Sequence, residues 1–139
     1  MKVHTTNYVN AFIEIAEDCP TKSAEMPPVK GDAKTIANYQ FEMLYDHPYK
    51  YTSDDVIFGV YSTRNDIKKT ELKEARAQFF SKGQPCMRTS PLTKRYGWGV
   101  HSNEDGKIAL YACESLEYKK YAKDKKLEVV KAMRSKKVS

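Results

Sequence analysis

Hydroxyl, cationic, aromatic and glycine residues lie close together in residues 90–101, SPLTKRYGWGVH. With Arg88 just before it, this stretch offers five potential donors to an anion within eight positions. An arginine guanidinium binds a carboxylate or phosphate through two parallel hydrogen bonds, and a lysine adds a point charge. The segment therefore predicts a site for a small anionic ligand or partner, formed by Arg88, Ser90, Lys94, Arg95, Trp98 and His101.

The glycines of this segment could mark the ligand's position. Gly97 and Gly99 lie with His101 on one face of the strand expected to begin at Tyr96. Glycine weakens a strand unless a bulge, a bend or a close approach requires it, so a ligand on this face would explain both glycines. Ordinary packing is the commoner explanation, in which a helix crosses over the glycines and the basic residues flank a buried Trp98.

A thiol-dependent enzyme is the first alternative. Cys86 and His101 could form a nucleophile–base pair, and the nearby Arg88 would favour the thiolate. A phosphatase-like loop would place an arginine six residues after the cysteine, where this chain has Leu92. Free cysteines are also among the most buried residue types, so core packing is the simpler role for Cys86.

No pattern in the sequence is typical of a metal or cofactor site. The three histidines lack the i, i+4 spacing that brings zinc ligands together, and the chain has no C-x-x-C, glycine-rich phosphate loop, G-x-S-x-G or H-E-x-x-H. Asp54 and Asp55 are adjacent, and a turn in which Thr52 or Asp54 bonds to the backbone is the interpretation we favour. We therefore expect no metal and no cofactor.

The charge is unevenly divided along the chain. Residues 1–63 contain five Lys, no Arg and nine Asp or Glu, for a net charge of −4, whereas residues 64–139 contain nineteen Lys or Arg and nine Asp or Glu, for +10. A basic half can attract a polyanion, so a nucleic-acid-binding module is the second alternative. Many of the lysines fall in KKYAKDKK and RSKK, where a solvated helix face and a tail account for them, and nucleic acid is not the favoured partner.

Length and composition predict a single globular domain. The chain has 139 residues, of which 40% are hydrophobic, and this is enough to bury a core without a disulfide or a metal. No linker, repeat or low-complexity stretch divides it. We expect one domain over residues 1–139, with an ordered core over about 7–134 and a basic C-terminal tail; the sequence leaves the oligomeric state open.

The chain carries no signal for export or membrane insertion. Its N-terminus, MKVHTTNYVN, lacks the layout of a signal peptide, and no apolar run approaches the roughly 18 residues that span a bilayer. Cys19, Cys86 and Cys113 are odd in number and widely spaced, which argues against a disulfide framework. We therefore expect a reduced, cytoplasmic protein without a membrane partner.

Hydrophobic periodicity predicts the helices and strands. Helices are expected between Asp32, as the cap, and Pro48, over residues 72–79, from about 115 to 121, and after Asp124 with Leu127, Val130 and Met133 on one side. Strands are expected over residues 11–17 and, at the centre of the sheet, over 56–63 (VIFGVYST). Residues 96–101 and 107–113 alternate on either side of a polar turn and predict a β-hairpin. Together these elements predict a two-layer α+β domain with a small, mainly antiparallel sheet.

Four segments carry a resemblance to a known family: FIEIAEDCP, PYKYTSDDVIF, FFSKGQPCMRTSPLTKRYGWGVHSNEDGKIALY and VKAMRSKK. The sequence resembles a family of small, mostly bacterial, uncharacterised proteins that carry a domain of unknown function. The resemblance spans about residues 7–137, and the block KRYGWGVH is its most specific part. It implies a stand-alone single-domain protein and brings no activity, cofactor or catalytic residue with it.

Overall fold

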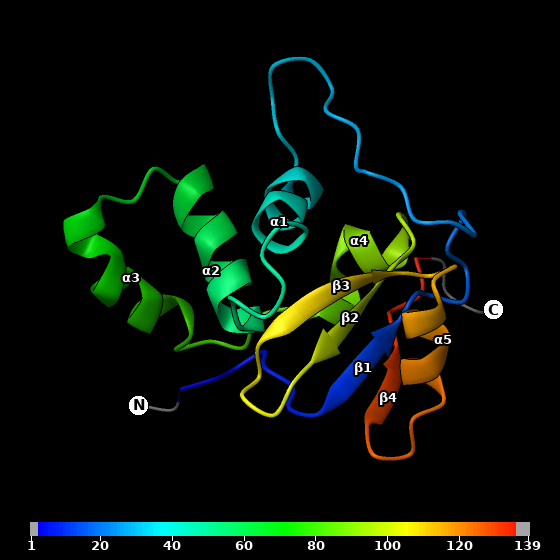
Figure 1. The fold of residues 1–139 in the computed structure, drawn as a ribbon. Coiled ribbons are helices and arrows are strands. Elements are labelled where there is room, and N and C mark those ends of the chain that lie inside the picture. Colours follow the sequence, from blue (N-terminus) through cyan, green and yellow to red (C-terminus); the bar gives the residue numbers. More distant parts are fainter. Residues whose placement is uncertain (1–2, 136–139) are drawn as a thin grey trace.

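The computed structural model describes residues 3–135, and it has an α+β architecture (Figure 1). Its strands are β1 (Ala11–Glu14), β2 (Trp98–Ser102), β3 (Ile108–Ala112) and β4 (Glu128–Lys131). Its helices are α1 (Ile36–Leu44), α2 (Ser53–Arg64), α3 (Leu72–Phe79), α4 (Pro91–Lys94) and α5 (Leu116–Ala122), with short 3-10 turns η1 (Lys69–Glu71) and η2 (Met87–Thr89). The predicted α+β class is confirmed.

The strands form one sheet in the order β3-β2-β1-β4. β1 pairs antiparallel with β2, with Phe12 opposite His101, and β2 pairs antiparallel with β3, with Val100 opposite Leu110. β4 lies on the other side of β1 and runs parallel to it. The expected hairpin is therefore confirmed as β2 and β3, and the sheet is mainly antiparallel.

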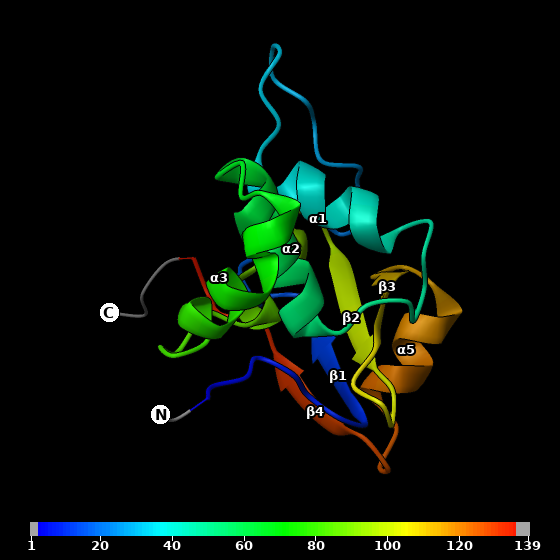
Figure 2. The same ribbon diagram turned by 90° about the vertical axis from the view of Figure 1, so that its left-hand side faces the viewer.

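Alternation along β1 and β2 sends side chains to opposite faces of the sheet. Ile13 and Val100 point to the face that packs on α1, α2 and η2, where the main hydrophobic core lies. Phe12 and Gly99 point to the other face, which α5 covers (Figure 2). Because Phe12 and Ile13 are both buried, β1 has no solvated face, and the sheet separates two groups of side chains.

Close approach of α5 requires the glycine at position 99. A Cβ atom there would lie 2.6 Å from Cε2 of Tyr118 and 2.7 Å from Cζ of Phe12. The Tyr118 hydroxyl also accepts a hydrogen bond from the backbone nitrogen of Ile15, at 2.9 Å, which holds α5 over β1. The face of Gly99 is thus closed by the protein's own aromatic rings, as the packing explanation predicts.

The expected central strand over residues 56–63 is wrong, since these residues belong to α2. Thr52 caps this helix: its hydroxyl accepts a hydrogen bond from the backbone of Asp55, whose carboxylate accepts one from the backbone of Thr52. The next-door Asp54 accepts hydrogen bonds from Thr5 and Thr6, so the paired acids begin a helix instead of a turn before a strand. α2 is covered on several sides, which produces a continuous apolar run that resembles a buried strand.

The last helix expected from the sequence is also wrong. Residues 128–131 form β4, although Leu127, Val130 and Met133 have helical spacing. The backbone of Glu128 donates to the carbonyl of Asn10, and that of Ala132 donates to the carbonyl of Glu14. Pairing with the free edge of β1 satisfies these backbone groups and overrides the local helical pattern.

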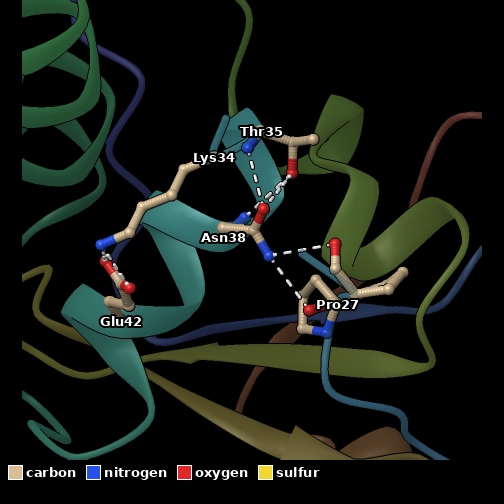
Figure 3. Close-up of polar contacts among 6 residues, drawn as sticks. Pro27, Lys34, Thr35, Asn38 and Glu42 are labelled. Atoms are coloured by element: carbon tan, nitrogen blue, oxygen red, sulfur yellow. Dashed lines mark hydrogen bonds and ion pairs between the residues drawn. The ribbon is translucent and has the colours of Figure 1, made fainter. Parts of the chain in front are cut away.

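Two other boundaries differ from expectation. β1 ends at Glu14 instead of position 17, because the chain leaves the sheet and Ala16 donates to the carbonyl of Thr93. Thr35 caps α1 in place of Asp32, and its backbone nitrogen donates to Asn38 Oδ1 at 2.8 Å (Figure 3). The amide nitrogen of Asn38 donates in turn to the carbonyl of Pro27, which fastens the preceding loop to the helix (Figure 3). The helices expected over 72–79 and 115–121 are confirmed as α3 and α5.

Substitution of Gly99 by alanine should destabilise the fold by about 1–3 kcal/mol, because the new methyl group forces Phe12 and Tyr118 from their positions. Urea denaturation would measure the change in free energy of unfolding. Gly83→Ala is the matched control, since a Cβ atom at Gly83 would lie no closer than 3.9 Å to a neighbouring atom. Equal stability of the two variants would contradict this account of the sheet.

Candidate functional site

The structure places Trp98 and His101, both expected in the site, on opposite faces of β2. Trp98 is 8% exposed and packs with Phe41 and Leu92, and its indole nitrogen donates to the carbonyl of Glu25 at 2.8 Å. His101 lies on the face that α5 covers. The two side chains therefore cannot contact one small ligand together, and Trp98 serves the core.

The three cations expected in the site are also dispersed. Arg88 Nε donates to the carbonyl of Lys131 at 2.7 Å, while the carbonyl of Arg88 accepts from the backbone of Met133. Arg95 is exposed, and its guanidinium lies 5.7 Å from the ring centre of Tyr96. Lys94 lies in the last turn of α4. None of the three lines either cavity described below.

A cavity of about 560 Å³ lies between the helices. We call it the interhelical pocket, and it is bounded by α1, α2, α3 and the segment 84–91. Its apolar wall consists of Ile36, Ile57, Val60, Phe79, Pro85 and Pro91, and its polar lining includes Gln40, Tyr61, Arg64, Gln84, Cys86 and Ser90. This volume and this mixed lining are typical of small-molecule sites. Of the residues expected in the site, the structure brings Ser90 here.

Gln40 and Ser90 are the buried polar residues of the pocket. Gln40 is only 6% exposed. Its side-chain oxygen Oε1 accepts a 2.5 Å hydrogen bond from the Ser90 hydroxyl. That hydroxyl also accepts from the backbone of Leu92, so Ser90 caps α4 and positions Gln40 at once. Among residues 3–135, the Gln40 amide nitrogen Nε2 has no hydrogen-bond partner, and it is not sealed from the cavity that Gln40 lines. Because Nε2 is open to the cavity, it is available to donate a hydrogen bond to a ligand there.

Arg64 brings a positive charge to the same cavity. It is the last residue of α2, it is exposed, and it forms no ion pair with another described residue. Ile57, Tyr61 and Arg64 are spaced by four and three residues, so they share one face of α2. This helical spacing is visible in the sequence. It went unused because residues 56–63 were expected to form a strand.

A second cavity of about 390 Å³ lies on the other side of α1 and includes Lys34, Glu42 and His47. Lys34 Nζ lies 2.8 Å from a carboxylate oxygen of Glu42, and the pair is drawn in Figure 3. The cation of this cavity is therefore already neutralised, in contrast to Arg64. We take the interhelical pocket as the candidate site for this reason.

Cys86 lines the interhelical pocket, but its neighbours differ from the expected ones. Burial raises the pKa of Tyr8, Cys86 raises it further, and Arg88 opposes this change, so the Tyr8 hydroxyl lies close to each of these two side chains. Cys86 precedes Met87, which packs in the core on the α2 side of the sheet, whereas His101 is on the α5 side. The structure thus does not assemble the expected pair of Cys86 and His101.

His101 is held in a group of aromatic rings. Its Nδ1 shares a 2.8 Å hydrogen bond with the hydroxyl of Tyr49, which also bonds to the Tyr111 hydroxyl at 2.8 Å. Its ring stacks on Tyr121 with centres 4.2 Å apart. Tyr49 reaches it from a left-handed backbone conformation, with φ of 61°. Burial lowers the pKa of His101, and the charge of Asp124 opposes this change.

Part of the basic C-terminal half is neutralised within the fold. Lys131 and Arg134 both pair with Glu17, at 3.1 and 3.2 Å, and Arg76 pairs with Asp55 at 2.9 Å. These contacts reduce the charge that a nucleic acid would meet. These pairs lie at the surface and do not involve the other lysines of this half, which stay solvated. Binding to nucleic acid therefore stays a prediction.

Within residues 3–135, no three side chains of His, Cys, Asp or Glu are grouped so that they could hold a metal ion. None of the helices in this part of the chain combines the length and the apolar content that a bilayer crossing requires. Cys19, Cys86 and Cys113 are free thiols.

The environment of His101 predicts a pH dependence. Since burial lowers its pKa from 6.5, the unfolded chain binds the proton more readily, and the free energy of unfolding should fall as the pH drops below 6.5. NMR titration of the imidazole should give a pKa below 6.5. A His101→Gln variant should lose this part of the pH dependence, and a pKa at or above 6.5 in the wild type would contradict the burial seen here.

Comparison with known proteins places the chain in a family. Searches of the curated proteins and of the solved structures gave no match. Residues 3–138 match the model of a family described as "Family of unknown function (DUF6157)". The match covers nearly the whole chain, and the chain therefore belongs to the DUF6157 family.

Proposed function

We propose that this protein binds a small anionic molecule with an apolar body in the interhelical pocket. The observation that carries the proposal is the presence, in one cavity, of the Gln40 Nε2 donor, which makes no hydrogen bond within residues 3–135, and the Arg64 guanidinium, which forms no ion pair there. A ligand that accepts a hydrogen bond from Nε2 and carries an anionic group for Arg64 would use both of these unpaired groups.

The other walls of the pocket suggest the rest of the ligand. Arg64 would bind a carboxylate or phosphate at the edge of the pocket, since no described side chain neutralises it. Ile57, Phe79 and Pro85 would contact an apolar body between the two polar ends. The ligand class is the one that the sequence suggests, but its cation is Arg64 instead of Arg88, Lys94 and Arg95.

The cellular setting we propose is the reducing cytoplasm of a bacterium. Three free cysteines in odd number support a reducing compartment, and the family resemblance supports a bacterial origin. In this setting the fraction of the protein that holds ligand rises and falls with the concentration of that ligand in the cell.

Ligand-observed NMR against a panel of aromatic and aliphatic carboxylates, each matched with its neutral amide, tests the proposal. Carboxylates should bind better than their amides, and Arg64→Gln should weaken the binding by about tenfold or more, as expected for a lost charge-assisted hydrogen bond of about 1.5–3 kcal/mol. Gln40→Met should weaken binding of carboxylates and amides alike, because it removes the amide donor of the pocket.

The control is the double variant Lys94→Ala, Arg95→Ala, which lies outside the pocket and should bind the same carboxylates as well as the wild type does. If this control lost binding while Arg64→Gln kept it, the binding site would lie in the segment 88–101 and not in the pocket. Absence of any preference for carboxylates over amides would contradict the proposal. In protein-observed spectra of the isotope-labelled chain, ligand-induced shifts confined to residues outside the pocket would contradict it as well.

A further inference from the structure

We propose that the outward side of α5 and the turn after it bind the phosphate backbone of a double-stranded nucleic acid. We call this region the α5 lysine surface, and it consists of Lys119, Lys120, Lys123, Lys125 and Lys126. α5 covers one face of the sheet, whereas α1 and α2, which bound the interhelical pocket, pack on the other face (Figure 2). The α5 lysine surface is therefore separate from the proposed small-molecule site.

The direction of the side chains along α5 is the first support. Tyr118 packs edge-on against Phe12 of β1, with ring centres 5.0 Å apart, and the ring of Tyr121 stacks on His101 of β2. These contacts hold one side of α5 on the sheet. A helix turns by about 100° per residue, which places a different set of residues on the side away from the sheet. The residues of that outward side, all exposed, are Leu116, Lys119, Lys120 and, at the C-terminal cap, Lys123.

The turn after α5 adds two further cations. The backbone nitrogen of Leu127 donates to the carbonyl of Asp124 at 3.2 Å, which closes a four-residue turn with Lys125 and Lys126 at its central positions. Both lysines are exposed. The Asp124 side chain accepts a 2.8 Å hydrogen bond from the backbone nitrogen of Lys126, so the acid of this turn fixes its shape. The turn therefore extends the cationic surface beyond the end of the helix.

The charge of this surface is not neutralised within the fold. None of its five lysines forms an ion pair with another residue of the described range 3–135. Lys131 and Arg134, further along the same half of the chain, both pair with Glu17. Glu117 is the acid of α5, and it lies about 100° round the helix from Leu116, on the flank of the outward side. The outward side is thus uniformly basic.

The partner that fits this surface is a polyanion with closely spaced charges. Lys119 and Lys123 lie about one helical turn apart, or roughly 6 Å along the axis. Duplex DNA carries one negative charge per roughly 1.7 Å of its length, so several phosphates can face the lysines at once. Proteins that bind single strands stack the bases on exposed aromatic rings, whereas the rings of α5 face the sheet. A duplex is therefore the form of nucleic acid that we propose.

An anionic membrane would use the same cations, but it fits less well. Leu116 is 78% exposed and could enter a bilayer beside the lysines. Helices that lie on membranes bury a whole apolar side in the lipid. The apolar side of α5 is occupied by the sheet, where Tyr118 is 8% exposed, and one leucine supplies little apolar area in its place. Charge is therefore the main attraction that this surface offers.

Fluorescence anisotropy of a labelled DNA duplex of about 20 base pairs, titrated with the full chain at several salt concentrations, tests the proposal. The chain should bind at about 50 mM salt, and the logarithm of the association constant should fall linearly with the logarithm of salt concentration. The slope should lie between about −3.5 and −4.5 if four or five lysines contact phosphates. A scrambled base sequence should bind equally well, because phosphate contacts carry no sequence information.

Two triple variants locate the binding surface. Lys119→Gln with Lys120→Gln and Lys123→Gln should weaken binding by about tenfold or more and make the slope shallower by about 2–3, since three phosphate contacts are lost. The matched control, Lys68→Gln with Lys69→Gln and Lys73→Gln, removes the same charge from exposed lysines around η1 and α3, at the other end of the molecule from α5 (Figure 1). It should change the affinity by no more than about twofold, because salt screens distant charges.

Equal weakening by the two triple variants would overturn the proposal, because it would show attraction to the net charge of the molecule and not to one surface. Absence of binding at about 50 mM salt, or tighter binding to a single strand of the same length, would overturn it as well. Vesicles that contain phosphatidylglycerol form a further arm. If they bind the chain more tightly than the duplex does and Leu116→Ser abolishes that binding, the partner of α5 is a membrane and the proposal is wrong.

The test is independent of the interhelical pocket. Arg64→Gln, which should weaken binding of carboxylates, should leave the salt dependence of duplex binding unchanged, because Arg64 lies in the pocket and not on the α5 lysine surface. The triple variant of α5 should in turn bind carboxylates as the wild type does. A duplex affinity that depended on Arg64 as strongly as on the lysines of α5 would overturn the assignment to α5.

Discussion

Burial of the central strands on both faces is the constraint on which the arrangement depends. Phe12 and Ile13, adjacent in β1, are both buried, so helices must cover each side of the sheet. Neighbouring residues on β1 and β2 then belong to different compartments, with Val100 among the helices α1 and α2 and His101 beneath α5. This is why a segment that gathers reactive residues in sequence separates them in space, whereas residues from four distant segments meet at one pocket.

The pocket exists because α3 is held against α2 at a distance from the sheet (Figure 1). The guanidinium of Arg76 lies 5.8 Å from the ring centre of Phe58 and 5.6 Å from that of Phe80, and it pairs with Asp55. Asp55 also caps α2 through Thr52, so one carboxylate joins the start of α2 to α3. The side-chain amide of Gln84 donates a hydrogen bond to the carbonyl of Phe79, at the end of α3. A few polar contacts therefore hold the helices that form the apolar wall of the pocket.

Much of the fold could be predicted from the sequence, and its two errors share a cause. The hairpin, α3 and α5 have clear periodicity, because each has one buried side. α2 is covered on several sides and so loses its helical period, and β4 has a helical period but pairs with β1. In both segments, tertiary contacts determine the secondary structure, and the local sequence pattern does not.

The same limit applies to the site. Cys86 and Ser90 stood out in the sequence, whereas Gln40 and Arg64 lie on other helices, and only the fold brings them to the pocket.

Arg88 acts at the margin of the sheet. β4 is an edge strand, and its outward carbonyl at Lys131 would be open to another extended chain if the Arg88 side chain did not occupy it. The carbonyl of Arg88 occupies the backbone N–H of Met133, two residues further on. Unpaired edges are where strands of separate molecules join, and such joining leads to aggregation. A residue that seemed suited to hold an anion thus protects the molecule from association through β4.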